Sequence, residues 1–122
     1  MNLPIEDDAH HLVLILNHDY LGSSVIDEVH DLIVNSRVRR FIIHVISSDG
    51  RPKYLDKLRP ILTSIMSCTL MVRYEGSTEE DFRNLINSLR RDNTTVLIVG
   101  GNGRVFEEVL HELGFKYKFL EV

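Results

Sequence analysis

The residues best suited to chemistry in this chain form a short glycine-rich segment, Gly100-Gly101-Asn102-Gly103-Arg104. Three glycines within four positions are more than a tight turn requires, and they allow backbone N–H groups to approach an anion closely. A helix is expected to begin just after the segment and to add its positive end at the same place. No Gly-Lys-Ser/Thr follows, so the segment is not a P-loop. The pattern predicts a site for a phosphate-sized anionic ligand.

Three further polar residues follow predicted strands and are expected beside this segment. The carboxyl ends of parallel strands meet at one edge of a sheet, where open α/β folds bind their ligands. With a strand order of 2-1-3-4-5, the loops after strands one, three and four share one crevice, in which we expect Asp19 to form an ion pair with Arg104. The predicted ligand-binding residues are therefore Asp19, Tyr20, Ser77, Gly100, Gly101, Asn102, Gly103 and Arg104.

The other reactive side chains favour structural roles. His10, His11 and His18 lie near acidic residues at the amino terminus, a pattern more typical of a solvated arm than of a metal site. His44 falls inside an apolar run, which indicates a hydrogen-bonded residue of the core or of an interface. Cys68 is interpreted as a small apolar filler and not as a nucleophile. The sequence contains no Ser/His/Asp arrangement or nucleophile elbow, so neither a catalytic residue nor a metal ligand is predicted.

The segments that must position these residues are four apolar runs and one alternating run. Leu12–Leu16, Phe41–Ile46, Leu70–Val72 and Val96–Val99 are rich in Val, Ile and Leu and do not alternate with polar residues. Such runs are typical of strands buried on both faces in a parallel sheet. The last segment, Phe115–Phe119, does alternate, and its lysines suit a sheet edge that must not recruit another chain.

Between the runs, apolar residues repeat with the period of a helix. The repeats predict amphipathic helices around residues 25–33, 82–89 and 105–113. Another helix is expected from about Lys53, and Pro60 is expected to kink or restart it.

Capping residues predict where these helices begin and end. Ser77 with Glu80 forms the pattern of a capping box, and Ser24 with Asp27 forms a weaker one. Gly114 suits the left-handed position that follows the last helix.

The element order is therefore β-α-β-α-β-α-β-α-β. Right-handed crossovers convert this order into an α/β fold: a three-layer, doubly wound sandwich of the Rossmann or flavodoxin-like type. Its mainly parallel sheet is expected to have five strands, with the fifth at an edge. The 122 residues suffice for one domain. Residues 1–10 are expected to form a short mobile arm, and residues 11–122 a single α/β domain.

The composition excludes several classes of protein. With 43% hydrophobic residues, the chain is too apolar to be disordered, and its longest apolar run is too short to span a membrane. The amino terminus lacks the apolar stretch of a secretory signal. A single cysteine leaves no internal disulfide and no cysteine-based zinc site. A cytoplasmic protein with no membrane partner is the simplest expectation.

Residues 94–122 resemble the closing strand–helix–strand of NYN/PIN-like nuclease domains. The resemblance rests on Thr95-Val-Leu-Ile-Val-Gly-Gly-Asn-Gly-Arg-Val-Phe, followed by Leu-His-Glu-Leu-Gly-Phe-Lys-Tyr-Lys. It implies metal-assisted cleavage of RNA, with Mg²⁺ or Mn²⁺ held by acids at the strand ends and with Asn17 or Asp19 as the acid of the first strand. Asn102 and Arg104 stand where the family has aspartates, and an arginine there repels a metal ion.

The segment Val99–Arg104 also resembles the Gly-Gly-Asp-Gly-Thr loop of diacylglycerol, sphingosine and NAD kinases. Leu14–Asn17 would then correspond to their first strand. Here Asn102 replaces the key aspartate and Arg104 replaces the threonine, so we expect no kinase activity.

Three hypotheses of function follow. The first is a non-catalytic module that binds a nucleotide or another phosphate-bearing small molecule in the crevice, without a metal cofactor. The second is a NYN/PIN-like ribonuclease domain, metal-dependent or eroded, whose partner is RNA; the net charge of −4 counts against it. The third is a ligand-free module for protein interaction or self-assembly, for example as a homodimer.

Overall fold

The computed structural model describes residues 9–16, 23–48, 50–52, 55, 60, 69–100 and 104–120, with only the backbone of Ser23 and Arg104. In these residues five strands form one sheet in which every pair is parallel. The strands are β1 (His10–Leu16), β2 (Arg40–Ser47), β3 (Thr69–Gly76), β4 (Thr94–Val99) and β5 (Lys116–Leu120). The helices are α1 (Ser23–Ser36), α3 (Glu79–Asn87) and α4 (Arg104–Leu113), with a 3₁₀ turn at Arg91–Asn93 before β4.

The strands in the middle of the sheet are buried on both faces, as their unalternating apolar runs predict. In β1, successive side chains point to opposite faces, and every residue from His11 to Leu16 is buried. Leu12, Leu14 and Leu16 enter one apolar cluster, and Val13 and Ile15 enter another. The sheet therefore needs a cover of helices on each side.

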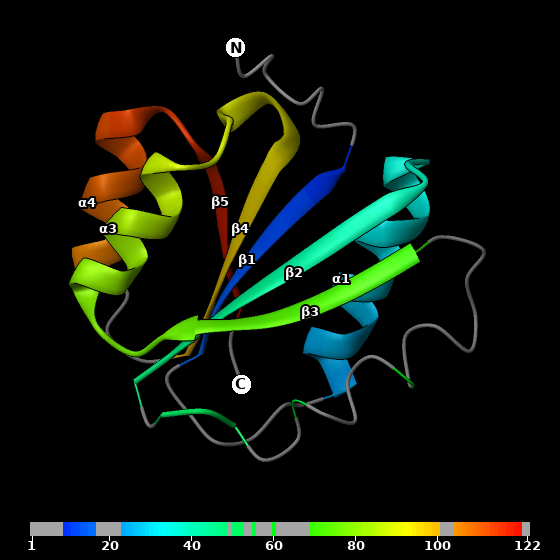
Figure 1. Cartoon of the computed structure of the whole chain (residues 1–122), viewed down its shortest axis with the longest axis horizontal. Coiled ribbons are helices and arrows are strands. Elements are labelled where there is room, and N and C mark those ends of the chain that lie inside the picture. Colours follow the sequence, from blue (N-terminus) through cyan, green and yellow to red (C-terminus); the bar gives the residue numbers. More distant parts are fainter. Residues whose placement is uncertain are drawn as a thin grey trace, which may run out of the picture.

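The two apolar clusters show which helices cover which face. The first cluster contains Val25, Val29 and Ile33, which belong to α1. The second contains residues of α3 and α4: Phe82, Leu85, Ile86, Val109 and Leu110. Figure 1 shows the same division, with α1 on one side of the sheet and α3 and α4 together on the other. The expected doubly wound α/β fold with a parallel five-stranded sheet is confirmed.

The strand order is β3-β2-β1-β4-β5, so the order 2-1-3-4-5 is wrong. The first two crossovers both step in the same direction, from β1 to β2 and from β2 to β3. The third returns past β2 and β1 to place β4 on the free side of β1. A right-handed crossover determines which face of the sheet its helix covers only when the direction of the step along the sheet is known. The apolar runs predict the strands but not the direction of each step.

The fifth strand lies at an edge of the sheet, as expected, and it is attached to both helical layers. Tyr117 Oη donates a hydrogen bond of 3.0 Å to Glu107 of α4. Lys118 Nζ donates one of 2.8 Å to Glu28 of α1. Because neighbouring strand residues point to opposite faces, two consecutive side chains reach the two layers.

Helix α3 begins with a capping box, but one residue later than the sequence pattern predicts. The N-cap is Thr78, whose hydroxyl accepts from the N–H of Asp81, and the Asp81 carboxylate accepts from the N–H of Thr78. The pairing of Ser77 with Glu80 is therefore wrong. Strand β3 continues to Gly76, beyond the apolar run that ends at Val72, and this extension moves the start of the helix. Hydrogen bonds from the Thr78 N–H, the Thr78 hydroxyl and the Ser77 N–H hold the pKa of Asp81 below its ordinary value.

The expected end of α4 is confirmed, and the expected start of α1 is wrong. Gly114 has a φ of +75° and its N–H donates to His111, while the N–H of Phe115 donates to the carbonyl of Leu110. These two bonds form a Schellman motif. Helix α1 begins at Ser23, so Ser24 lies inside it and is not its N-cap.

Two other predictions concern parts of the chain that are only partly described. His10 is the first residue of β1 and Ala9 is buried, so the last two residues of the expected arm lie against or within the sheet; residues 1–8 are outside the described residues. The expected helix from Lys53 also lies outside them, except for Leu55 and Pro60.

In the described part of the chain, no helix is long and apolar enough to cross a membrane.

Gly76 is a position at which a side chain is expected to be costly. Its φ is +136°, and a Cβ atom there would overlap the Asp81 carboxylate of the capping box. Gly50 has a φ of +84° with nothing within 4 Å of its Cβ position, which makes it a matched control. We predict that Gly50→Ala lowers the free energy of unfolding by about 1 kcal/mol through backbone strain alone. Gly76→Ala should cost at least about twice as much, and equal costs in urea denaturation would contradict this account.

Candidate functional site

Most of the predicted ligand-binding residues lie outside the described residues. These are Asp19, Tyr20, Gly101, Asn102 and Gly103, so the expected ion pair between Asp19 and Arg104 stays a prediction. Gly100 directly follows β4, and Arg104 is the first residue of α4.

The structure brings the ends of β1 and β4 together at the carboxyl edge of the sheet. The two strands are neighbours, and their last residues, Leu16 and Val99, pair with each other. Gly100 turns away from β4 with a φ of +64°, and its N–H donates a 3.0 Å hydrogen bond to the carbonyl of Leu120 in β5. The last residue of β1 and the last residue before the glycine-rich segment therefore lie side by side.

Ser77 does not lie near the carboxyl ends of β1 and β4. It follows β3, which lies at the opposite edge from β5, with β2 and β1 between β3 and β4. Strands are spaced by about 4.8 Å, so the ends of β3 and β4 are separated by roughly 14 Å. The Ser77 N–H donates to the Asp81 carboxylate, as part of the start of α3. Its inclusion among the residues of the crevice followed from the wrong strand order.

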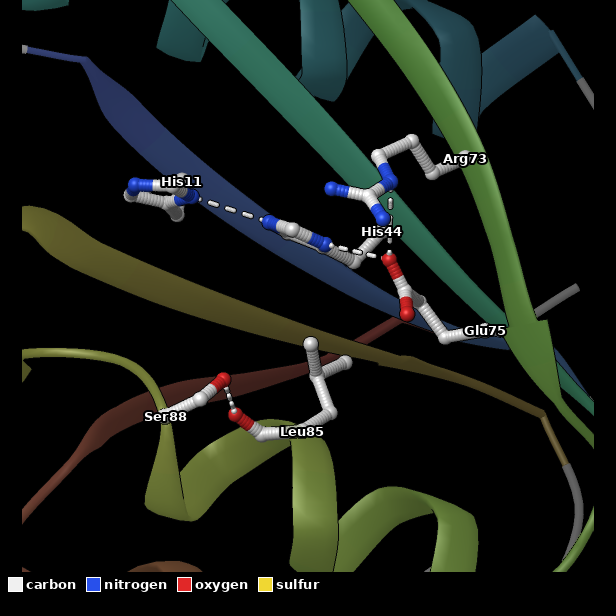
Figure 2. Close-up of polar contacts among 6 residues, drawn as sticks. All are labelled: His11, His44, Arg73, Glu75, Leu85 and Ser88. Carbon is white, nitrogen blue, oxygen red and sulfur yellow. Dashed lines mark hydrogen bonds and ion pairs between the residues drawn. The ribbon is translucent and has the colours of Figure 1, made fainter.

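A second polar arrangement lies within the sheet itself, on the face that α3 and α4 cover. His11 of β1, His44 of β2 and Glu75 of β3 form a line across three adjacent strands (Figure 2). His11 Nδ1 and His44 Nε2 are 2.9 Å apart, and His44 Nδ1 is 2.9 Å from Glu75 Oε1. We call these three residues the histidine chain.

The bonding partners determine which nitrogen carries each proton at neutral pH. The Glu75 carboxylate accepts, so His44 must donate from Nδ1. The Nε2 atom of a neutral His44 is then an acceptor, and His11 must donate to it from Nδ1. The two rings stack, with centroids 5.1 Å apart. Each link of the histidine chain therefore contains one proton.

Burial keeps His44, the middle residue of the histidine chain, neutral. His44 is only 4% exposed, and burial lowers the pKa of its imidazole below the ordinary value of 6.5. The hydrogen bond and the negative charge of Glu75 act in the opposite direction, while His11 and Arg73 lower the pKa further. Burial is the largest of these effects, so an added proton on His44 is disfavoured in the folded protein.

Glu75 is placed by an irregularity in the sheet. Tyr74 pairs with Val45 and Gly76 pairs with Ile46, which leaves Glu75 as an extra residue on β3. A β-bulge of this kind changes the direction of a side chain, and it is rare between parallel strands. The Glu75 carboxylate also lies 3.4 Å from Nε of Arg73, whose side chain is 58% exposed. Glu75 therefore has a buried partner on one side and a solvated partner on the other.

The histidine chain does not have the arrangement of a metal site. Both ring nitrogens of His44 already have partners, at Glu75 and at His11. Among the described residues, no group of three or more His, Cys, Asp or Glu side chains could hold a metal ion. What the arrangement can do is hold and pass protons across three strands.

Sequence reasoning found one member of the histidine chain and missed two. His44 was expected to be a hydrogen-bonded core residue, and this is confirmed. His11 was assigned to a solvated arm, which is wrong: it is 6% exposed, because β1 begins before its apolar run. Glu75 lies beyond the apolar run of its strand. For His11 the available signal was a polar residue directly before an apolar run, but its partner depends on the strand order.

His10, the neighbour of His11, points to the other face. Its Nε2 lies 3.2 Å from the Thr95 hydroxyl, and its ring stacks on Phe41. Burial, followed by the proximity of His11, lowers the pKa of His10.

No protein-family model matches the chain, and neither does a curated protein or a solved structure. What the two sites can do must therefore be derived from their own geometry.

We predict that removing the acceptor of the histidine chain destabilises the protein. Glu75→Ala leaves the Nδ1–H of His44 without its acceptor in a buried place, and should lower the free energy of unfolding by about 1–3 kcal/mol. Glu75→Gln keeps an oxygen acceptor and should cost less. Glu79→Ala, which removes an exposed pair with Arg83, is the control and should cost less than about 1 kcal/mol. Equal urea midpoints for the two alanine variants would mean that the buried hydrogen bond between Glu75 and His44 contributes no more than an exposed ion pair, and would contradict the prediction.

The pH dependence of stability should follow from the two lowered histidine pKa values. His44 and His10 both have a pKa below 6.5 in the folded state, so the unfolded chain takes up protons first as the pH falls through 6.5. The free energy of unfolding should thus be constant from pH 8 to about 7 and decrease below about 6.5. Urea denaturation at pH 5.5, 6.5 and 7.5 measures this decrease, and His44→Asn should make it smaller. A protein more stable at pH 5.5 than at 7.5 would reverse the sign and refute the assignment.

Proposed function

We propose that this protein is a non-catalytic binding module that holds a phosphate-bearing small molecule, such as a nucleotide, at the carboxyl edge of its sheet. The ligand lies beyond the ends of β1 and β4, against the glycine-rich segment Gly100–Arg104 and the residues that follow β1. The observation that supports this most is the strand order. From β1 the chain passes to α1 on one face, whereas β4 leads to α4 on the other. Open α/β sheets bind ligands at such a reversal point.

The chemistry of the glycine-rich segment favours an anion. Gly100 already leaves β4 in a left-handed conformation, and α4 begins four residues later with Arg104. Glycines without side chains permit several backbone N–H groups to point at one phosphate oxygen, and the amino-terminal end of α4 has a positive partial charge. Arg104 would add a charge-assisted hydrogen bond. The N–H groups, the helix end and the arginine all present positive charge or partial positive charge, which suits a phosphate or a carboxylate.

The same residues disfavour metal-dependent hydrolysis. A hydrolytic Mg²⁺ or Mn²⁺ site needs carboxylates at the strand ends, but the segment offers Asn102, a neutral side chain, and Arg104, a fixed positive charge. The ribonuclease hypothesis therefore serves as the alternative outcome of the experiment below. The single cysteine supports a cytoplasmic location as part of this proposal.

Thermal denaturation with inorganic phosphate, ADP and NAD, each at 1 and 10 mM, tests the proposal. At least one of these anions should raise the melting temperature, because a ligand that binds only the folded state stabilises it. Arg104→Ala should weaken binding by about 1.5–3 kcal/mol, or roughly 10- to 150-fold in Kd.

Arg39→Ala is the matched control. Arg39 is exposed and directly precedes β2, so it lies at the amino-terminal ends of the strands, opposite to the proposed site. Its removal should leave the affinity unchanged. Equal weakening by both substitutions would indicate a general charge effect and contradict the site. Cleavage of RNA in the presence of Mn²⁺, abolished by Asp19→Asn, would establish the ribonuclease function instead.

A further inference from the structure

The histidine chain holds the place where the edge strand β3 turns toward α3. Glu75 is the extra residue of the bulge, Gly76 ends the strand, and Thr78 caps α3. As an edge strand, β3 has only one neighbouring strand, β2. The side-chain link from Glu75 to His44 therefore attaches the end of an edge strand to the centre of the sheet.

Before its end at Glu75, β3 has little cover on the face of the histidine chain. Met71 is 44% exposed and the Arg73 side chain is 58% exposed, although both point to the same face as Glu75. The central strands, by contrast, are buried on both faces. Opening the end of β3 would hydrate His44 and Glu75 at a lower cost than opening β1 or β4.

Added protons disfavour the closed state, in which the hydrogen bonds of the histidine chain are formed. A first added proton can be carried within the histidine chain, if His11 changes its tautomer and accepts from a doubly protonated His44. A second added proton places an N–H of one ring against an N–H of the other, and the 2.9 Å contact between His11 and His44 cannot persist. Either state places a positive charge on buried rings, and a hydrated His44 accepts a proton more readily.

The charged groups around His44 come from two strands. Strand β1 contributes His11, and strand β3 contributes Glu75 and Arg73. Helix α3, which packs on the same face, contributes apolar residues: Phe82, Leu85 and Ile86. Near its end, Ser88 donates its hydroxyl to the carbonyl of Leu85 and brings no charge (Figure 2). In the described part of this face, Glu75 is thus the one negative group in contact with His44, and Arg73 shares it.

We propose that the histidine chain is an acid-sensitive latch, which holds the carboxyl end of β3 and the start of α3 on the sheet at neutral pH and releases them in acid. Protons bind the open state better than the closed state, so a fall in pH shifts the population toward the open state. Each linked proton increases the opening constant by up to about tenfold per pH unit. The latch does not depend on the proposed ligand site, because it lies on other residues.

Amide hydrogen exchange of the whole protein tests the latch. Protection factors, corrected for the intrinsic effect of pH on exchange, are compared at pH 7.5, 6.5 and 5.5 for residues 70–81 and for β4. Between pH 6.5 and 5.5 the protection of residues 74–81 should fall by up to about tenfold more than that of β4, which follows the global loss of stability. An equal fall in both segments would mean global unfolding, and a constant value in residues 74–81 would mean that there is no latch.

Two substitutions separate the latch from other titrations. His44→Asn keeps a donor toward Glu75 but removes the titratable ring, so the pH dependence in residues 74–81 should disappear. His10→Asn is the matched control, because His10 is a half-buried histidine on the opposite face, and it should leave that dependence intact. A pH dependence that survives His44→Asn refutes the latch.

Wild-type protein gives a decisive measurement even if His44→Asn fails to fold. Nitrogen-15 spectra of the imidazoles should show the Nδ1–H tautomer of His44 at pH 7.5. The state in which both rings are doubly protonated should then appear together with the loss of protection in residues 74–81. Double protonation of both rings while these residues keep their protection would overturn the proposal.

Discussion

The burial of both faces of the central strands is the constraint on which the rest of this structure depends. Strand β1 has no solvated side from His11 to Leu16, so helices must cover it twice. Right-handed crossovers can supply two covers only if the chain steps one way from β1 and later returns to its other side. The same reversal places the ends of β1 and β4 side by side. The proposed ligand site is thus a by-product of covering the core.

The histidine chain is an exception within this apolar sheet, and its position explains how it is tolerated. Buried polar groups are costly unless each has a partner, and His44 has one at each ring nitrogen. Glu75 reaches His44 because a bulge displaces it, and its charge is shared with the solvated Arg73. The network therefore runs from the buried interior to the exposed edge. Removing one partner from such a network is costly, because it leaves a buried polar group without its hydrogen bond.

The sequence predicts the elements well because their signals are local. The run Val96–Val99 predicts β4, and Gly114 predicts the end of α4, since each depends on its own residues and near neighbours. The strand order and the partners of His11 and Glu75 could not be predicted, because they depend on which strands become neighbours. Ser77 illustrates the difference: its place after a strand was expected correctly, yet that strand lies at the far edge. The glycine-rich segment was recognisable by composition, whereas the histidine chain needed three strands in register.

The central position of β1 also has a consequence for the order of events during synthesis. Strand β1 cannot pair with β4 until the last third of the sequence has been synthesised. His10, for example, contacts Thr95, 85 residues later in the sequence. Until β4 and α4 emerge, β1 in the nascent half-sheet β1-β2-β3 has one unpaired edge, and Val13 and Ile15 lack the part of their cover that α4 supplies. Contacts between residues so distant in sequence form slowly, and unpaired strand edges favour aggregation. The sheet is therefore completed during synthesis only after β4 and β5 have emerged from the ribosome.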